Sequence, residues 1–188
     1  MKMIAFVGMP ASGKSEASSV AKEMGIPVVT MGDVIRKEVE KRGADPADGG
    51  KIATELRKME GMDAIAKRCI DLIHEKMKTT DSKVFVIDGV RGIAEVEYFK
   101  KSLGAGFLLV SIAIDSSLES RFERIMNRKR EDDMITIEKL HERDTRELSW
   151  GMGEAIAASD RIIENKSTLE AYRQSIRNLF EEMIAEER

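Results

Sequence analysis

The sequence predicts an α/β fold, in which helices cover both faces of a parallel β-sheet. Short apolar runs alternate along the chain with longer amphipathic stretches, which is typical of parallel strands linked by crossover helices. The apolar runs are hydrophobic almost throughout and do not alternate with polar residues, so both faces of the sheet should be buried. A length of 188 residues suits one domain with a proper core. We therefore expect residues 1–188 to form a single domain.

Five apolar runs are the expected strands, and they span residues 3–7, 26–29, 84–88, 107–114 and 161–164. Amphipathic segments between them predict helices. Two helices should begin at capping boxes, 116–119 and 167–170, in which a Ser hydroxyl accepts from an early backbone N–H and a Glu reaches back. The last helix carries an apolar stripe that should close the domain against the sheet. The stripe consists of Leu169, Tyr172, Ile176, Leu179, Phe180 and Met183.

Two segments are longer than the single crossover helix that is needed to link one parallel strand to the next. Residues 30–80 contain several helical stretches, interrupted by the turn-rich sequence "GADPADGG" at 43–50. Residues 126–150 form a highly charged insertion before the last strand. Both insertions are candidates for mobile pieces that handle a substrate.

Composition limits the classes of partner. The 31 Lys and Arg against 34 Asp and Glu leave no overall basic field to attract nucleic acid or an anionic membrane. No apolar run approaches the length that spans a bilayer. The single cysteine, Cys69, excludes an internal disulfide framework and lies at helical spacing from apolar neighbours, which predicts a buried thiol. We expect a cytoplasmic protein with no nucleic-acid partner and no membrane attachment.

The clearest functional signal is "GMPASGKS", which follows the first strand and precedes a helix. It matches the phosphate-binding pattern G-x-x-x-x-G-K-[ST] in the required context, which disfavours an accidental glycine-rich turn. Glycines at both ends let successive backbone N–H groups approach phosphate oxygens. In this pattern Lys14 reaches the β and γ phosphates as a catalytic cation, and Ser15 ligates Mg²⁺. The expected nucleotide-binding residues are Gly8, Met9, Pro10, Ala11, Ser12, Gly13, Lys14 and Ser15.

Asp88 ends the third apolar run. An acidic residue at the carboxyl end of a buried parallel strand lies at the edge where ligands bind, near enough to orient Mg²⁺, usually through water. It could instead cap the turn that Asp88-Gly89 begins. With a phosphate-binding loop in the same chain, we favour the metal and catalytic role.

Two elements of the form "acid then arginine" follow separate strands. Asp33 and Arg36 follow the second strand, and Asp88 and Arg91 follow the third. A guanidinium can hold phosphate through two parallel hydrogen bonds, so Arg36 and Arg91 are candidates for binding a second anionic group. Surface ion pairs are the alternative interpretation.

Arginines also gather near the second insertion. Arg121, Arg124 and Arg128 are spaced to share one helix face, and Arg130 and Arg143 follow. Neighbouring glutamates could neutralise such a face and leave it merely solvated. Phosphoryl transfer, however, requires cations around the transferred group and the exclusion of water, which favours a lid that carries arginines.

Taken in order, the motifs resemble those of the P-loop nucleoside monophosphate kinases. The resemblance lies in GxxxxGKS, "GDVIR", "IDGVR", "RFERIMNRKREDD" and a final "IIENKS" loop. Through "MGDVIR", "REDD" and "RELSWGMGE", nearly the whole chain is similar to an archaeal family related to adenylate kinase and dephospho-CoA kinase.

The resemblance implies a three-layer P-loop NTPase fold with five parallel strands in the order 2-3-1-4-5. Residues 30–80 would be a helical insertion that binds the acceptor, and residues 126–150 would be a lid. ATP would bind residues 8–15, with Asn165 near the adenine, and the acceptor phosphate would bind Arg36 and Arg91. The lid residues around the transferred phosphoryl would be Arg124, Arg128, Arg130 and Arg143.

Departures from the adenylate kinase pattern leave the acceptor open. Ala11 replaces a glycine that is common in that loop, "IDGVRG" lacks a proline, and the lid has no Cys cluster for zinc. We expect a kinase that transfers the γ-phosphoryl of Mg-ATP to a small phosphorylated metabolite, with a nucleoside monophosphate as the first expectation.

Other functions remain as alternatives. In a kinase of the dephospho-CoA type the acceptor is a hydroxyl, and Asp33 stands where its base would lie. A third possibility is a regulatory protein that binds ATP without turnover. A GTPase switch is disfavoured because Asp88 is followed at once by glycine and Asn165-Lys166-Ser167-Thr168 lacks the final Asp of a base-reading motif.

Overall fold

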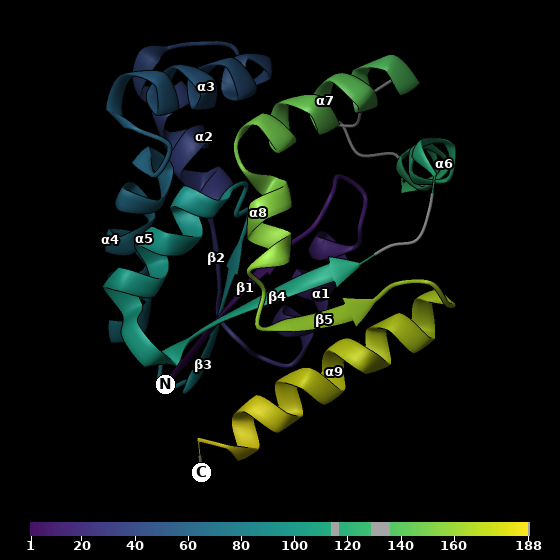
Figure 1. Ribbon diagram of the computed structural model, residues 1–188. Coiled ribbons are helices and arrows are strands. Elements are labelled where there is room, and N and C mark those ends of the chain that lie inside the picture. Colours follow the sequence, from purple (N-terminus) through teal and green to yellow (C-terminus); the bar gives the residue numbers. More distant parts are fainter. Residues whose placement is uncertain (114–116, 129–135, 188) are drawn as a thin grey trace.

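In the computed structural model, five strands form one parallel sheet in the order β2-β3-β1-β4-β5 (Figure 1). The structure describes residues 1–113, 117–128 and 136–187. The strands are β1 (Lys2–Val7), β2 (Val28–Thr30), β3 (Val84–Asp88), β4 (Phe107–Ala113) and β5 (Arg161–Glu164). The α/β class and the strand order that the resemblance implied are both confirmed.

The second strand begins two residues later than predicted, at Val28. The N–H of Ile26 donates to the Ala21 carbonyl, where the preceding helix ends. Pro27 has no N–H to donate to a neighbouring strand. Ile26 and Pro27 extend the apolar run in the sequence, but for these reasons they do not belong to β2.

Two layers of helices cover the sheet (Figure 1). Helices α1 (Lys14–Glu23) and α9 (Leu169–Ala185) pack on one face, where the rings of Phe6 and Phe180 meet edge to face with centroids 6.1 Å apart. Helices α4 (Ala64–Lys78), α5 (Ile93–Leu103) and α8 (Met152–Ala157) cover the other face. Burial on both faces explains why the strand sequences are apolar almost throughout.

The apolar stripe of α9 is buried at five of its six predicted positions, from Tyr172 to Met183. Leu169, the first helical residue, is the exception, with 61% of its surface exposed. The N-cap is Thr168, whose hydroxyl accepts from the Ala171 N–H at 3.3 Å, so the prediction of a cap at Ser167 was wrong by one residue. The other predicted box begins at Ser116, outside the described residues.

Residues 30–80 form a helical insertion, as the sequence predicted. It contains α2 (Met31–Arg42), a 3₁₀ turn (Pro46–Asp48), α3 (Gly49–Glu60) and α4. Val39, Ile52, Leu56 and Ala64 give it a small core of its own. Cys69 of α4 is fully buried, which confirms that prediction.

Helix α6 (Leu118–Arg128) overlaps the predicted second insertion, residues 126–150, only at its last three residues. Helix α7 (Ile137–Ser149) lies within this insertion, and the two helices contact each other. A further 3₁₀ turn (Gly104–Gly106) precedes β4. Figure 1 shows α7 and α3 at the same end of the molecule, at the top of the view. Arg130 lies outside the described residues, and so does the side chain of Arg128. Within the part of the chain that the structure describes, no helix is long and apolar enough to cross a membrane.

Candidate active site

The segment from Gly8 to Ser15 links β1 to α1 through an unusual backbone. Gly8, Ala11 and Gly13 have positive φ angles of 148°, 62° and 113°. Glycine adopts such angles freely, whereas an alanine in the left-handed region costs about 1–2 kcal/mol. The Ser12 N–H donates to the Met9 carbonyl at 3.1 Å, so Met9 to Ser12 form a turn with features of type II.

Side chains from distant segments hold this loop by its carbonyl groups. The Asn165 amide donates to the Ser12 carbonyl at 2.9 Å, and the Tyr172 hydroxyl donates to the Gly13 carbonyl at 2.9 Å. In a trans peptide the C=O and N–H point in opposite directions. Fixing the carbonyls therefore also fixes the directions of the N–H groups, as a loop prepared for phosphate requires.

Gly13 is packed too tightly to accept a side chain. A Cβ there would lie 2.6 Å from Asn165 Nδ2 and 3.0 Å from the Tyr172 hydroxyl. Asn165, predicted to lie near the adenine, is thus part of the site through the loop itself. Tyr172 was predicted only as a core residue, because the helical spacing that buries its ring gave no sign of the hydroxyl contact.

Lys14 is buried at the start of α1, and its ammonium turns back onto the loop. It donates to the carbonyls of Gly8 and Met9 and, at 3.4 Å, to the Ser12 hydroxyl. Burial, followed by the charge of Arg91, lowers the Lys14 pKa to about 7, although Glu147 and Asp88 favour the charged form. The ammonium has only loop oxygens as hydrogen-bond partners among the described residues, and a phosphate oxygen could replace them.

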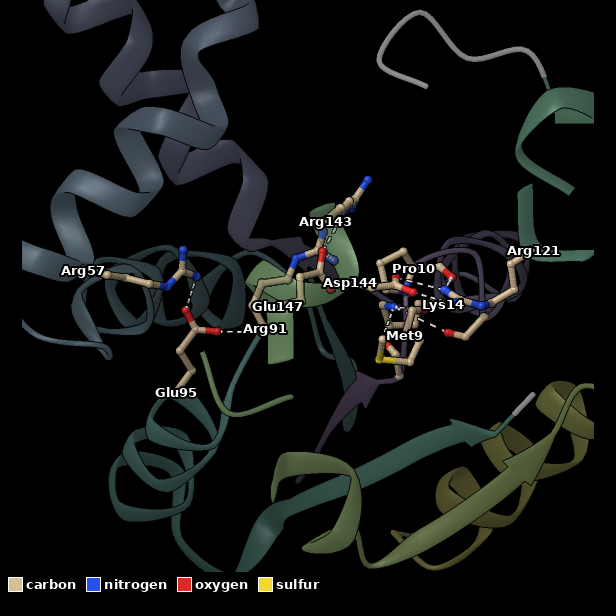
Figure 2. A network of polar contacts seen from close by, with 12 residues as sticks. Met9, Pro10, Lys14, Arg57, Arg91, Glu95, Arg121, Arg143, Asp144 and Glu147 are labelled. Atoms are coloured by element: carbon tan, nitrogen blue, oxygen red, sulfur yellow. Dashed lines mark hydrogen bonds and ion pairs between the residues drawn. The ribbon is translucent and has the colours of Figure 1, made fainter. Parts of the chain in front are cut away.

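Glu147 of α7 joins two of the predicted arginines (Figure 2). One oxygen, Oε1, accepts from Arg91 Nη1 at 3.0 Å and from Arg143 Nε at 2.8 Å. Burial alone would raise the pKa of this carboxyl, but the charges of Arg91, Arg143 and Lys14 outweigh burial and lower it. The second oxygen, Oε2, is buried and has no hydrogen-bond partner in the described ranges. Arg91, Arg143 and Lys14 thus surround one buried carboxylate beside the loop.

The turn that carries Arg91 is held from its other side by Glu95 of α5. Glu95 accepts from the Arg91 N–H at 2.7 Å and from Arg57 Nη2 at 2.6 Å, and burial raises the pKa of its carboxyl. The Arg57 guanidinium lies 4.2 Å from the ring centroid of Trp150, which directly follows α7. A Cβ at Gly92 would lie 1.9 Å from the Trp150 carbonyl oxygen. The first insertion, the Arg91 turn and the end of the second insertion therefore meet here.

The arginines predicted on one face of α6 have different partners. Arg121 is buried in an ion pair with Asp144 of α7 and also donates to the Pro10 carbonyl at 3.1 Å. Arg124 Nη2 donates to the Asn165 carbonyl at 3.5 Å, beside the loop after β5. Glu95, Asp144 and Glu147 were not predicted as site residues, since carboxylates in charged helices look like solvated surface in the sequence.

Asp33 and Arg36 lie apart from this cluster. Arg36 Nε donates to the Asp33 carboxylate at 3.1 Å, and the two side chains are 51% and 65% exposed, Asp33 first. They line a groove of about 530 Å³ at the β2 edge of the sheet, with Val28 and Val29. No hydrogen bond or ion pair in the described parts of the chain joins either residue to Arg91.

Ser15 offers a hydroxyl in the first turn of α1, Asp88 offers a carboxylate at the carboxyl end of β3, and both residues are partly exposed. Mg²⁺ prefers such oxygen ligands and usually retains waters and substrate phosphates in its shell. The described residues contain no group of three or more His, Cys, Asp or Glu side chains that could hold a metal. The two residues fit a magnesium ion that arrives with a phosphate ligand.

Comparison with known sequences finds close relatives. The AAA domain family matches residues 7–141. A UPF0200 protein of Methanosarcina mazei is 61% identical over 181 residues, which cover 95% of this chain and 94% of that protein. A UPF0200 protein of Methanococcus vannielii is 41% identical over 186 residues, which cover 98% of this chain and 97% of that protein.

Comparison with solved structures finds the same fold in kinases. A dephospho-CoA kinase from Campylobacter jejuni has a TM-score of 0.61 at 17% identity, with all of both chains covered. A shikimate kinase from Acinetobacter baumannii in complex with shikimate has a TM-score of 0.54 at 15% identity, with 99% of this chain and 94% of that chain covered. At such identities the likeness establishes the P-loop kinase fold.

Proposed function

This chain belongs to the AAA domain family, together with the UPF0200 proteins of archaea, and from that premise we propose that it is an ATP-dependent small-molecule kinase. It would transfer the γ-phosphoryl of Mg-ATP to a phosphorylated metabolite, most simply a nucleoside monophosphate. The observation that carries the proposal is the cluster of Lys14, Arg91 and Arg143 around buried Glu147, directly beside the loop. A protein that only held ATP would need no further cations, the partly exposed Arg91 and Arg143, beside that loop.

The residues of the chain have separate tasks in this reaction. The N–H groups of residues 8–15 bind the triphosphate, and Lys14 exchanges its loop carbonyls for phosphate oxygens. Arg91 binds the acceptor phosphate, while Arg143 places positive charge at the transferred group. Arg124, Arg128 and Arg130 complete the lid, which keeps water out. Ser15 and Asp88 would hold Mg²⁺, which neutralises charge on the phosphate oxygens.

The position of Asp33 supports a phosphate acceptor over a hydroxyl acceptor. A phosphate oxygen is already anionic and needs no base, whereas a hydroxyl benefits from one. The Asp33 carboxylate is paired with Arg36 and lines the groove at β2, with no hydrogen bond or ion pair to Lys14 or Arg91 in the described structure. Arg36 would then contribute to the acceptor site only if the exposed pair with Asp33 opens.

A coupled assay of ADP release tests the proposal across nucleoside monophosphates and coenzyme precursors that include dephospho-CoA. We expect release with a nucleoside monophosphate, its loss in Lys14→Met, and its retention in Lys22→Met, an exposed lysine on the same helix. Asp33→Asn should retain turnover. ATP binding without ADP release for any acceptor would indicate a regulatory protein instead, and loss of turnover in Asp33→Asn would favour the hydroxyl kinase.

A further inference from the structure

Arg121 and Asp144 form a buried ion pair that also contacts the loop. Arg121 Nη1 donates to Asp144 Oδ1 at 3.0 Å and to the Pro10 carbonyl at 3.1 Å, while Nη2 donates to Asp144 Oδ2. Figure 2 shows Arg121, Asp144 and Pro10 gathered beside Lys14. Both side chains have less than a tenth of their surface exposed. Both terminal nitrogens of Arg121 thus already donate to protein oxygens, in a buried position.

The Pro10 carbonyl belongs to the strained part of the loop. Pro10 and Ala11 are the two central residues of the turn from Met9 to Ser12, and Ala11 has a φ of 62°. Type I and type II turns differ in the orientation of the peptide between these two central residues, which is flipped by about 180°. The third residue of the turn, here Ala11, has a negative φ in type I and a positive φ in type II. Alanine disfavours the left-handed region, so by itself this turn would relax toward type I. An interaction from outside the loop must hold the peptide in place.

We propose that Arg121 and Asp144 are positioning residues that fix the peptide between Pro10 and Ala11 in the orientation the phosphate-binding loop needs. Because C=O and N–H point in opposite directions in a trans peptide, the bond to Arg121 directs the Ala11 N–H away from the guanidinium. Asp144 compensates the charge of Arg121, and its two carboxylate oxygens accept from both terminal nitrogens and so fix the plane of the guanidinium. The benefit to ATP binding rests on the proposed function, whereas the effect on the loop does not.

The pair also connects the second insertion to the nucleotide loop. Arg121 lies on α6 and Asp144 on α7, so both helices must keep their places for the bond to Pro10 to persist. The shape of the loop of residues 8–15 therefore depends on the positions of α6 and α7.

An apolar replacement of the pair separates positioning from folding. Buried ion pairs can often be replaced by apolar side chains without loss of stability, so Arg121→Met with Asp144→Leu should stay folded while Pro10 loses its donor. We expect the carbon chemical shifts of Ala11 to leave the left-handed range in the ligand-free protein. The Kd for Mg-ATP should rise about tenfold, which corresponds to about 1.4 kcal/mol.

Adding Ala11→Gly to this double variant should recover most of the affinity for Mg-ATP, because glycine adopts the left-handed conformation without cost. A pair that only stabilised the fold would show no such rescue. Arg121→Lys is a second variant, which keeps a charge beside Asp144 but loses the planar fork, and it should weaken Mg-ATP binding similarly. Arg161→Gln with Glu182→Gln removes an exposed ion pair remote from the loop and serves as the control.

Unchanged Ala11 shifts in both Arg121 variants would overturn the inference, as would an unchanged Kd for Mg-ATP. If the unaltered protein does not bind Mg-ATP although the Ala11 shifts respond to Arg121, the proposed function fails and the positioning role stands.

Discussion

Glu147 shows how much one side chain determines at this site. Its Oε1 accepts from two arginines that come from different segments, and its Oε2 is buried without a hydrogen-bond partner in the described structure. A buried carboxylate is tolerated only when positive charges compensate for lost hydration, and here three cations do so. We infer that Glu147 keeps Arg91 and Arg143 together before phosphate ligands arrive.

Glu147→Gln should destabilise the protein by about 2 kcal/mol at pH 7, because the neutral amide no longer pairs with the charges of Arg91 and Arg143, which are partly exposed. The pKa of Glu147 is lowered in the folded state, so its contribution is present above the unfolded pKa of about 4.3 and is lost as the pH falls through the folded pKa. Urea unfolding at several pH values should therefore show a difference between the two proteins that shrinks toward acid pH. Glu142→Gln, at an exposed position of the same helix, is the control. A difference that grows toward acid pH would contradict this account.

Cys69 should be chemically inert in the native protein. Burial raises the pKa of its thiol to about 12, so only about one thiol in ten thousand is ionised at pH 8. Reaction with an aromatic disulfide reagent should be very slow at pH 8 and become fast when urea unfolds the chain. A native rate close to that of a free thiol would show that α4 opens readily or packs differently.

At the scale of elements, the contacts around Trp150 join α3, α5 and the end of α7. Arg57 of α3 pairs with Glu95 of α5 and lies over the Trp150 ring, and Arg146 of α7 lies 5.6 Å from the same ring centroid. The first insertion thereby contacts the second at a position next to Arg91. We expect these two insertions to move together when a ligand binds between them.

Arg57→Ala should loosen this junction and expose the Trp150 ring to water. Since Trp150 is the only tryptophan in the chain, its emission maximum should shift to longer wavelength and its quenching by iodide should increase. Arg68 lies on the neighbouring helix α4 and forms an exposed ion pair with Glu60 of α3. Arg68→Ala removes this pair and should leave the spectrum unchanged. Equal spectra for Arg57→Ala and the unaltered protein would mean that Arg57 does not shield the ring.

The elements that could be predicted from the sequence are those whose local pattern agrees with their final environment. Strands buried on both faces read as continuous apolar runs, and the loop has a fixed spacing of Gly, Lys and Ser. The start of β2 was missed because the N–H of the apolar Ile26 bonds to the end of α1, and Pro27, whose carbonyl accepts from Val86, has no N–H to donate. Leu169 followed the helical period, but it lies at the exposed first position of α9.

The partners of the site residues could not be predicted in the same way. Asp144 and Glu147 lie on a highly charged helix and differ from their solvated neighbours only through contacts with Arg121 and Arg91. For Glu147, the spacing of four residues from Arg143 was a local signal of a pair. Arg121 was grouped with the lid arginines by helical spacing, which cannot reveal that it holds the Pro10 carbonyl.

At the scale of the whole molecule, the parallel sheet brings together residues that are far apart in the sequence. The loop after β1, the turn after β3 and the Asn165 segment after β5 all lie at the carboxyl ends of strands, where ligands bind in such sheets. Helices α6 and α7 then add Arg121 and the Arg143–Glu147 pair to the same edge. The fold thus places the loop of residues 8–15 beside Arg91 and Arg143, which is the arrangement that the proposed function uses. The cytoplasmic location stays a prediction.

The most direct test of the central claim follows a labelled γ-phosphoryl from ATP to an acceptor. With the nucleoside monophosphate that gives the fastest ADP release, we predict that the label appears in the nucleoside diphosphate. Lys14→Met should lower this transfer by at least about a hundredfold, since the transferred group loses the ammonium that would bind its phosphate oxygens. Label that appears only as inorganic phosphate, or equal transfer by Lys14→Met, would contradict the assignment of the site as a kinase centre.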